Sequence, residues 1–93
     1  MNRKVWITGI GVLSPNGVGK KKFQEALLNG TSGIRKVSSF DASGLSCQIA
    51  GEVMIPENAF STQEKRNLPR TAQLAVQASD EALADAGLTD ENL

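Results

Sequence analysis

The sequence predicts an α/β fold whose elements follow the order strand, helix, one or two short strands, helix. Three segments carry this prediction. Residues 5–13 form a short apolar, β-branched run that is typical of a buried strand. Residues 18–29 place apolar side chains at helical spacing and end before Gly30, which suits a left-handed C-cap. Residues 70–86 form a longer, alanine-rich helical segment that ends before Gly87.

Two glycines in the first segment, Gly9 and Gly11, allow two interpretations. One is a dinucleotide-binding fingerprint, in which glycines let a pyrophosphate approach a helix N-terminus. Ser14 occupies the third glycine position, however, and Pro15 with Asn16 moves the next helix downstream of where a phosphate would need it. The sequence therefore favours a close-packed strand whose glycines admit a neighbouring backbone or helix. A small nucleotide-binding α/β module is the alternative.

The segment between the two helices is predicted to add two short strands and a capped helical turn. Residues 34–37 indicate a brief strand. Residues 47–53 alternate between two faces, which predicts a strand with one buried side and makes Cys47 a core residue rather than a nucleophile. Ser61 and Glu64 have the spacing of a capping box.

The long helix has small side chains along one side. Alanines recur there at helical spacing, at positions 75, 78, 82 and 86. Such a stripe lets a helix approach a sheet or another helix closely. Pro69 suits the first position of this helix. A polar loop over residues 89–92 then points towards a following strand, where the chain stops at Leu93, so the sequence reads as the opening of a larger domain.

Composition narrows the range of functions. The chain has 93 residues and a formal net charge of zero, so it fits one domain or part of one and has no basic excess that would favour nucleic acid. A single Cys excludes an internal disulfide or a multi-thiolate zinc site, and the absence of His removes the commonest metal ligand. We therefore expect no metal or other cofactor. Since no run approaches the ~20 apolar residues of a membrane span, we expect a cytoplasmic protein without a membrane partner.

Five short motifs occur together in one order. They are residues 5–19, residues 23–30 leading to 32–35, the pair Phe40-Asp41, residues 50–53, and residues 85–88. In this order they resemble the N-terminal segment of β-ketoacyl-acyl-carrier-protein synthases, the decarboxylating condensing enzymes of fatty-acid and polyketide synthesis. The resemblance covers nearly the whole chain. It implies that residues 1–93 are a partial N-terminal domain of an α/β, thiolase-like fold. This fold consists of two related βα halves.

The resemblance also implies a chemistry, the decarboxylative Claisen condensation of malonyl-carrier protein with an acyl thioester. In the family this reaction uses a Cys nucleophile and two histidines, or His and Asn. The chain has no His, and Cys47 falls where the family has no catalytic residue. No catalytic residue is carried over, so we expect this acyltransferase segment to be inactive alone. The alternative within the family is a noncatalytic, chain-length partner of a ketosynthase.

A docking edge for the acyl carrier protein is the site that the resemblance carries over. In the family, a basic stretch before the long helix helps to receive this acidic partner. The matching positions are Lys65, Arg66 and Arg70. The competing interpretation is three solvated charges beside a helix start. The resemblance further implies contact with the remainder of the ketosynthase fold and a homodimer.

Overall fold

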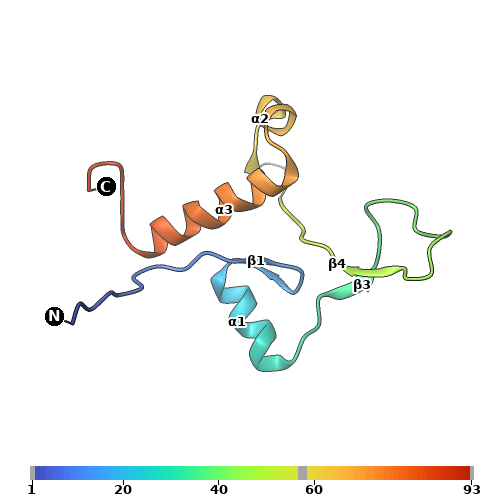
Figure 1. Cartoon of the computed structure of the whole chain (residues 1–93), viewed down its shortest axis with the longest axis horizontal. Helices are drawn as coiled ribbons and strands as arrows, with labels where there is room; N and C mark the ends of the chain where they lie inside the picture. The colour runs from blue at the N-terminus through green and yellow to red at the C-terminus, as the bar shows by residue number, and fades with distance from the viewer. Residues whose placement is uncertain (1, 57–58, 93) are drawn as a thin grey trace.

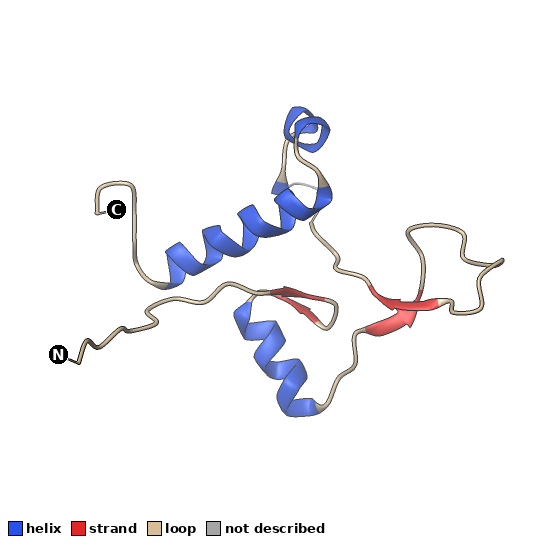
Figure 2. Cartoon of the chain, in the orientation of Figure 1, coloured by secondary structure: helices blue, strands red, loops and turns tan. Residues whose placement is uncertain are grey.

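The computed structural model describes residues 2–56 and 59–92, and within them the elements follow the predicted order (Figure 1). They are β1 (Leu13–Ser14), β2 (Gly17–Val18), α1 (Lys20–Asn29), β3 (Ile34–Lys36), β4 (Ile49–Gly51), α2 (Thr62–Asn67) and α3 (Arg70–Asp85). The strands form two antiparallel ribbons, β1–β2 and β3–β4, drawn in red in Figure 2. The β1–β2 ribbon lies between α1 and α3, and the β3–β4 ribbon lies to one side of them. The α/β class is confirmed.

The packing of these elements is open. Three residues form the buried apolar core of the described chain: Ala26, Ala42 and Phe60. The radius of gyration is 16.7 Å, whereas a compact domain of this length has about 12 Å. Much apolar surface therefore stays in contact with solvent.

The N-terminal segment is extended but is not a strand over most of its predicted length. Of residues 5–13, Leu13 alone enters a ribbon, as the first residue of β1, so the prediction of a strand across this range was wrong. A strand requires a neighbour that pairs with its N–H and C=O groups, and no described segment pairs with residues 5–11 in this way. Val12 makes one such bond, since its carbonyl accepts from the Gly19 N–H. Val5, Trp6 and Ile7 are 91%, 79% and 84% exposed.

The two glycines of this segment lie directly against α3, beside which the segment runs (Figure 1). A Cβ atom added to Gly9 would lie 2.8 Å from the Ala86 Cβ, and one added to Gly11 would lie 2.9 Å from the Ala82 N and overlap the Ala78 carbonyl. Real Cβ atoms do not approach that closely, so glycine is required at both positions. The packed-glycine interpretation is confirmed, and the alanine stripe of α3 is the surface that the glycines meet.

The turn after this segment closes the β1–β2 ribbon and lies against the β3–β4 ribbon. Pro15 and Asn16 join β1 to β2, and the Ser14 hydroxyl lies 2.8 Å from both the Asn16 Oδ1 and the Gly17 O. On its outer side, a Cβ atom at Gly51 of β4 would lie 2.7 Å from the Pro15 Cγ. The hairpin tip therefore packs against the β3–β4 ribbon.

Local signals set the helix ends. α1 begins at Lys20, two residues later than predicted, because Gly17 and Val18 pair as β2. It ends at Asn29, and its C-cap Gly30 has the predicted left-handed conformation with φ 68°. In α2 the capping box is confirmed: the Ser61 hydroxyl accepts from the Glu64 N–H at 3.1 Å, and the Glu64 carboxylate accepts from the Ser61 N–H at 3.0 Å.

The ends of α3 also follow its sequence closely. Pro69 was predicted to take the first helical position, but it is the N-cap, and the helix begins one residue later at Arg70. At the other end Gly87 has φ 73°, and the Leu88 N–H donates to the Leu83 O at 3.0 Å. This pairing satisfies one of the last carbonyl groups of the helix, as a left-handed C-cap does.

The prediction that Cys47 lies in the core was wrong. β4 covers Ile49–Gly51, so Cys47 precedes it, and both Cys47 and Ile49 are exposed. In the described chain nothing covers that side of the β3–β4 ribbon enough to bury them. The alternation of residues 47–53 predicts two different faces correctly, but it cannot say which of them is covered.

We expect Gly11→Ala to destabilise the chain by about 1–3 kcal/mol, because the added methyl group overlaps the backbone of α3. The measurement is urea unfolding followed by far-UV circular dichroism. Gly44→Ala is the matched control, since no heavy atom of the described chain lies within 4 Å of the Cβ position there. Its effect should not exceed about 1 kcal/mol. Equal destabilisation by both substitutions would contradict the close packing of Gly11 on α3.

Candidate functional site

The three basic residues expected at a docking edge come from two helices. Lys65 and Arg66 lie in the last turn of α2, where positive charge interacts favourably with the helix dipole. Arg70 is the first residue of α3. The capping box at Ser61 fixes where α2 begins, and so determines where its last turn presents these charges. All three residues are exposed.

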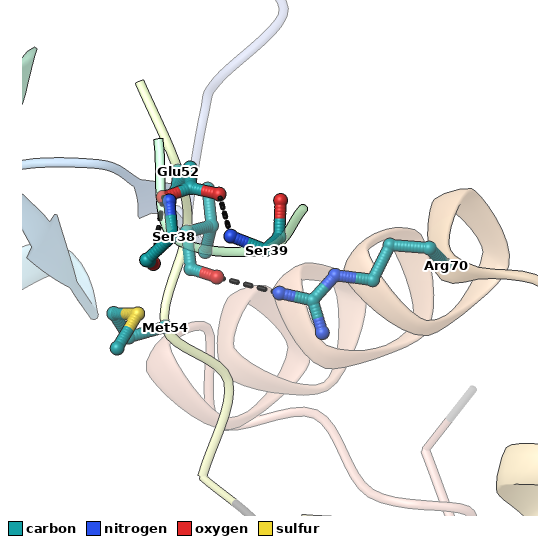
Figure 3. Close-up of a pocket in the computed structure, with 6 residues that line it drawn as sticks. Ser38, Ser39, Glu52, Met54 and Arg70 are labelled. Atoms are coloured by element: carbon teal, nitrogen blue, oxygen red, sulfur yellow. Dashed lines mark hydrogen bonds between the residues drawn. The ribbon is translucent and has the colours of Figure 1, made fainter. Parts of the chain in front are cut away.

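Arg70 differs from Lys65 and Arg66 in its contacts. One guanidinium nitrogen of Arg70, Nη2, donates to the Val53 carbonyl at 2.5 Å (Figure 3). This bond holds the start of α3 against the chain that follows β4. Arg70 is therefore both a surface charge and a structural tether.

Lys65 and Arg70 meet at one cavity, whereas Arg66 does not line it. The cavity has a volume of about 330 Å³, and its other lining residues are Ile55, Pro56, Phe60 and Gln73. Its lining combines apolar side chains with two positive charges. Arg66 lies apart from this cavity in the last turn of α2, without a hydrogen-bond partner among the described residues.

A second cavity, of about 450 Å³, is also lined by Arg70 and is drawn in Figure 3. Glu52 is its central polar group. One carboxylate oxygen of Glu52 accepts from the Ser38 N–H and hydroxyl, both at 2.9 Å, and the other accepts from the Ser39 N–H at 3.0 Å. Donation from Ser39 and Ser38 lowers the pKa of the Glu52 carboxyl from its ordinary 4.5 to about 2.

The role of Glu52 was missed from the sequence, which placed it on one face of an alternating strand. The two serines precede it by 14 and 13 residues, and no local pattern connects them. With its oxygens occupied by N–H and O–H donors, this carboxylate acts as a structural acceptor that closes the loop after β3.

Residues 2–56 and 59–92 contain no group of three or more His, Cys, Asp and Glu side chains placed to hold a metal ion. Across the same residues, no helix combines the length and apolar character needed to cross a bilayer. Cys47 lies on the surface, with its thiol 3.6 Å from the Ile49 carbonyl.

Acid should weaken the loop that Glu52 closes. Because the folded pKa lies below the ordinary value, the contribution of Glu52 to stability is complete above pH 4.5 and is lost as the pH falls from 4.5 towards 2. A carbon-detected NMR titration of the Glu52 carboxyl should show this low pKa. The double substitution Ser38→Ala and Ser39→Ala should raise it towards 4.5, while Ser46→Ala, which changes a serine outside the cluster, should leave it unchanged. A wild-type pKa near 4.5 would contradict the hydrogen bonding described.

Comparison with known proteins shows which family this chain resembles. The family described as β-ketoacyl synthase, N-terminal domain, matches residues 2–93. The granaticin polyketide β-ketoacyl synthase 1 of Streptomyces violaceoruber is 44% identical over 90 residues, which are 95% of this chain and 21% of the relative. The ketoacyl synthase β subunit of the tetracenomycin polyketide synthase of Streptomyces glaucescens is 40% identical over 90 residues, 94% of this chain and 22% of that protein.

A solved structure supports the same grouping. The ishigamide ketosynthase/chain length factor superposes with a TM-score of 0.78 and 34% sequence identity, over 94% of this chain and 22% of that one. The chain thus spans about a fifth of the length of these relatives. Sequence and fold agree, and the chain belongs to the β-ketoacyl synthase family, whose N-terminal domain it matches.

Proposed function

We propose that residues 1–93 supply the N-terminal part of a polyketide β-ketoacyl synthase, which condenses an acyl thioester with a malonyl unit and releases carbon dioxide. The observation that carries the proposal is the family match over residues 2–93. The pathway follows from the relatives, since those described above are named for polyketide systems. On this proposal the activity belongs to the family's whole fold.

The proposed role of these residues is structural. Condensation needs an activated nucleophile for the acyl group and donors that stabilise the developing oxyanion. The chain has no His, and its one thiol, that of Cys47, lies on the surface before β4. The close contact of the N-terminal segment with α3 instead provides a platform on which other parts of the fold would rest.

A second candidate function is that of a noncatalytic partner. The tetracenomycin β subunit and the ishigamide ketosynthase/chain length factor are both similar to this chain. A chain-length partner would use the same N-terminal architecture without performing the condensation. The two functions can be distinguished by which full-length relative stays functional when this chain replaces its matching segment.

We expect the chain to restore condensation when it replaces the matching segment of the granaticin synthase 1, and to show none alone. The assay follows the ketoacyl product and carbon dioxide from acyl and malonyl carrier-protein thioesters. Grafts with Gly11→Ala and Gly44→Ala provide the matched pair, and the first should lose activity. A folded but inactive graft, together with an active graft in the tetracenomycin β subunit, would favour the partner function. Turnover by the isolated chain that survives Cys47→Ala would contradict both.

We further propose that Lys65, Arg66 and Arg70 contact an acyl carrier protein. Exposed charges that face an acidic partner act mainly on encounter and orientation. Lys65 and Arg66 supply this charge freely from the end of α2, whereas the Arg70 guanidinium is shared with the Val53 carbonyl. Lys65 lines the 330 Å³ cavity, whereas Arg66 lines neither cavity described above, so Arg66 is the strongest candidate for a direct contact.

Titration of a labelled carrier protein into a full-length protein that bears this segment should show weak, salt-sensitive binding. Added salt shortens the Debye length from about 10 Å at 0.1 M, so affinity should fall as salt rises. Arg66→Glu should weaken binding most. Lys21→Glu, which makes the same charge change on the exposed surface of α1, is the control. Unchanged affinity for Glu at each of the three positions would place docking elsewhere.

A further inference from the structure

The start of α1 has no capping group of its own. Its N-cap is Gly19, with φ 98°, and a glycine offers no side-chain acceptor. The first turn then carries Lys20, Lys21 and Lys22, whose charges oppose the positive end of the helix dipole. The Phe23 N–H is the first to find an acceptor in the backbone of this turn, at the Gly19 carbonyl 3.0 Å away. The N–H groups before it need acceptors from elsewhere.

Glu81 of α3 provides such an acceptor from another part of the chain. Its Oε2 accepts from the Lys20 N–H at 2.8 Å, and its Oε1 accepts from the Val12 N–H at 2.8 Å. The two donors are neighbours, since the Gly19 N–H donates to the Val12 carbonyl at 2.8 Å. One carboxylate therefore joins the N-terminal segment, the start of α1 and α3.

Asp85 repeats the arrangement one helical turn later. Its Oδ2 accepts from the Ile10 N–H at 3.0 Å, and its Oδ1 pairs with the Lys20 ammonium at 2.5 Å. The Lys20 side chain and then the Ile10 N–H lower the pKa of the Asp85 carboxyl below its ordinary 3.8. The ionised form that accepts these bonds is thereby favoured.

The spacing of the two carboxylates matches that of the two N–H groups. Positions four apart on a helix are separated by about 6 Å along its axis. Donors two residues apart on an extended chain are separated by about 6.6 Å. Gly11 lies between the donors, and its close contact with Ala78 and Ala82 brings the segment near enough for both carboxylates to reach it. If the N-terminal segment were shifted by one residue along α3, these N–H groups would point away from the helix. Side chains of the segment would then lie against the alanines.

We propose that Glu81 acts as the capping acceptor of α1 from a distant position in the same chain. The first turn of α1 therefore depends on the docking of α3. Lys20 and Glu81 are 61 residues apart in the sequence, so this cap forms by tertiary contact. The first turn of α1, the Val12 N–H and the middle of α3 consequently gain order together.

The test is Glu81→Gln in the 93-residue chain, with amide hydrogen exchange read by NMR. Glutamine keeps one acceptor oxygen, but its NH2 group faces the other N–H, so one donor loses its partner. The exchange rates of the Lys20 and Val12 amides should rise roughly tenfold, in line with the loss of a capping acceptor. The Ala84 amide, further along α3, should keep its rate and shows that the helix remains formed.

Asp80→Asn is the matched control. It makes the same change of charge on the adjacent residue of α3, and Asp80 is exposed and makes no side-chain hydrogen bond within the described chain. An equal rise in exchange for Asp80→Asn and Glu81→Gln would overturn the proposal. So would wild-type rates at Lys20 and Val12 in Glu81→Gln, or unprotected amides at these positions in the wild-type chain.

The same Glu81→Gln substitution in a Lys20→Pro chain distinguishes loss of capping from general destabilisation. Lys20→Pro removes the N–H that Glu81 accepts, and proline is well tolerated at the first position of a helix. Glu81→Gln should then change exchange at the Phe23 amide less than it does in the Lys20 background. An undiminished effect would show that Glu81 acts on α1 by another route and would overturn the proposal.

Discussion

The contact between the N-terminal segment and α3 is the constraint on which the rest of this structure depends. Two glycines remove every side-chain atom from the near side of the segment, and the alanine stripe removes all but one carbon from the helix. Close approach then brings backbone N–H groups within reach of Glu81 and Asp85. Steric fit and hydrogen bonding are therefore parts of one arrangement, because neither would form at a greater separation.

The same use of a carboxylate recurs at a second place in the chain. Glu52 accepts backbone N–H groups of Ser38 and Ser39, as Glu81 does those of Val12 and Lys20. In both cases an acidic side chain supplies the acceptors that a neighbouring strand or a local cap supplies in other proteins. In a chain with short strands, these carboxylates replace part of the missing sheet hydrogen bonding.

What could be predicted from the sequence was mainly what neighbouring residues decide. Gly30, Gly87 and the Ser61–Glu64 box each act within one helical turn, and each was predicted correctly. The strand over residues 5–13 was not, because pairing depends on segments that local pattern does not locate. Glu81 looks like an ordinary solvated charge in the sequence, and its function becomes visible once α3 is placed beside Val12. At the candidate site, helix positions alone place Lys65 and Arg66, whereas the Arg70 bond to the Val53 carbonyl depends on where the chain runs after β4.

The sparse core has a consequence for the thermodynamics of the chain. Heat capacity changes on unfolding in proportion to the apolar surface that becomes newly hydrated. With Ala26, Ala42 and Phe60 as the buried apolar residues of the described chain, unfolding exposes less such surface than it does in a compact domain of equal length. The curve of folding free energy against temperature is accordingly shallow for this chain. Warming or cooling changes the folding free energy of the chain less than that of a compact domain of equal length.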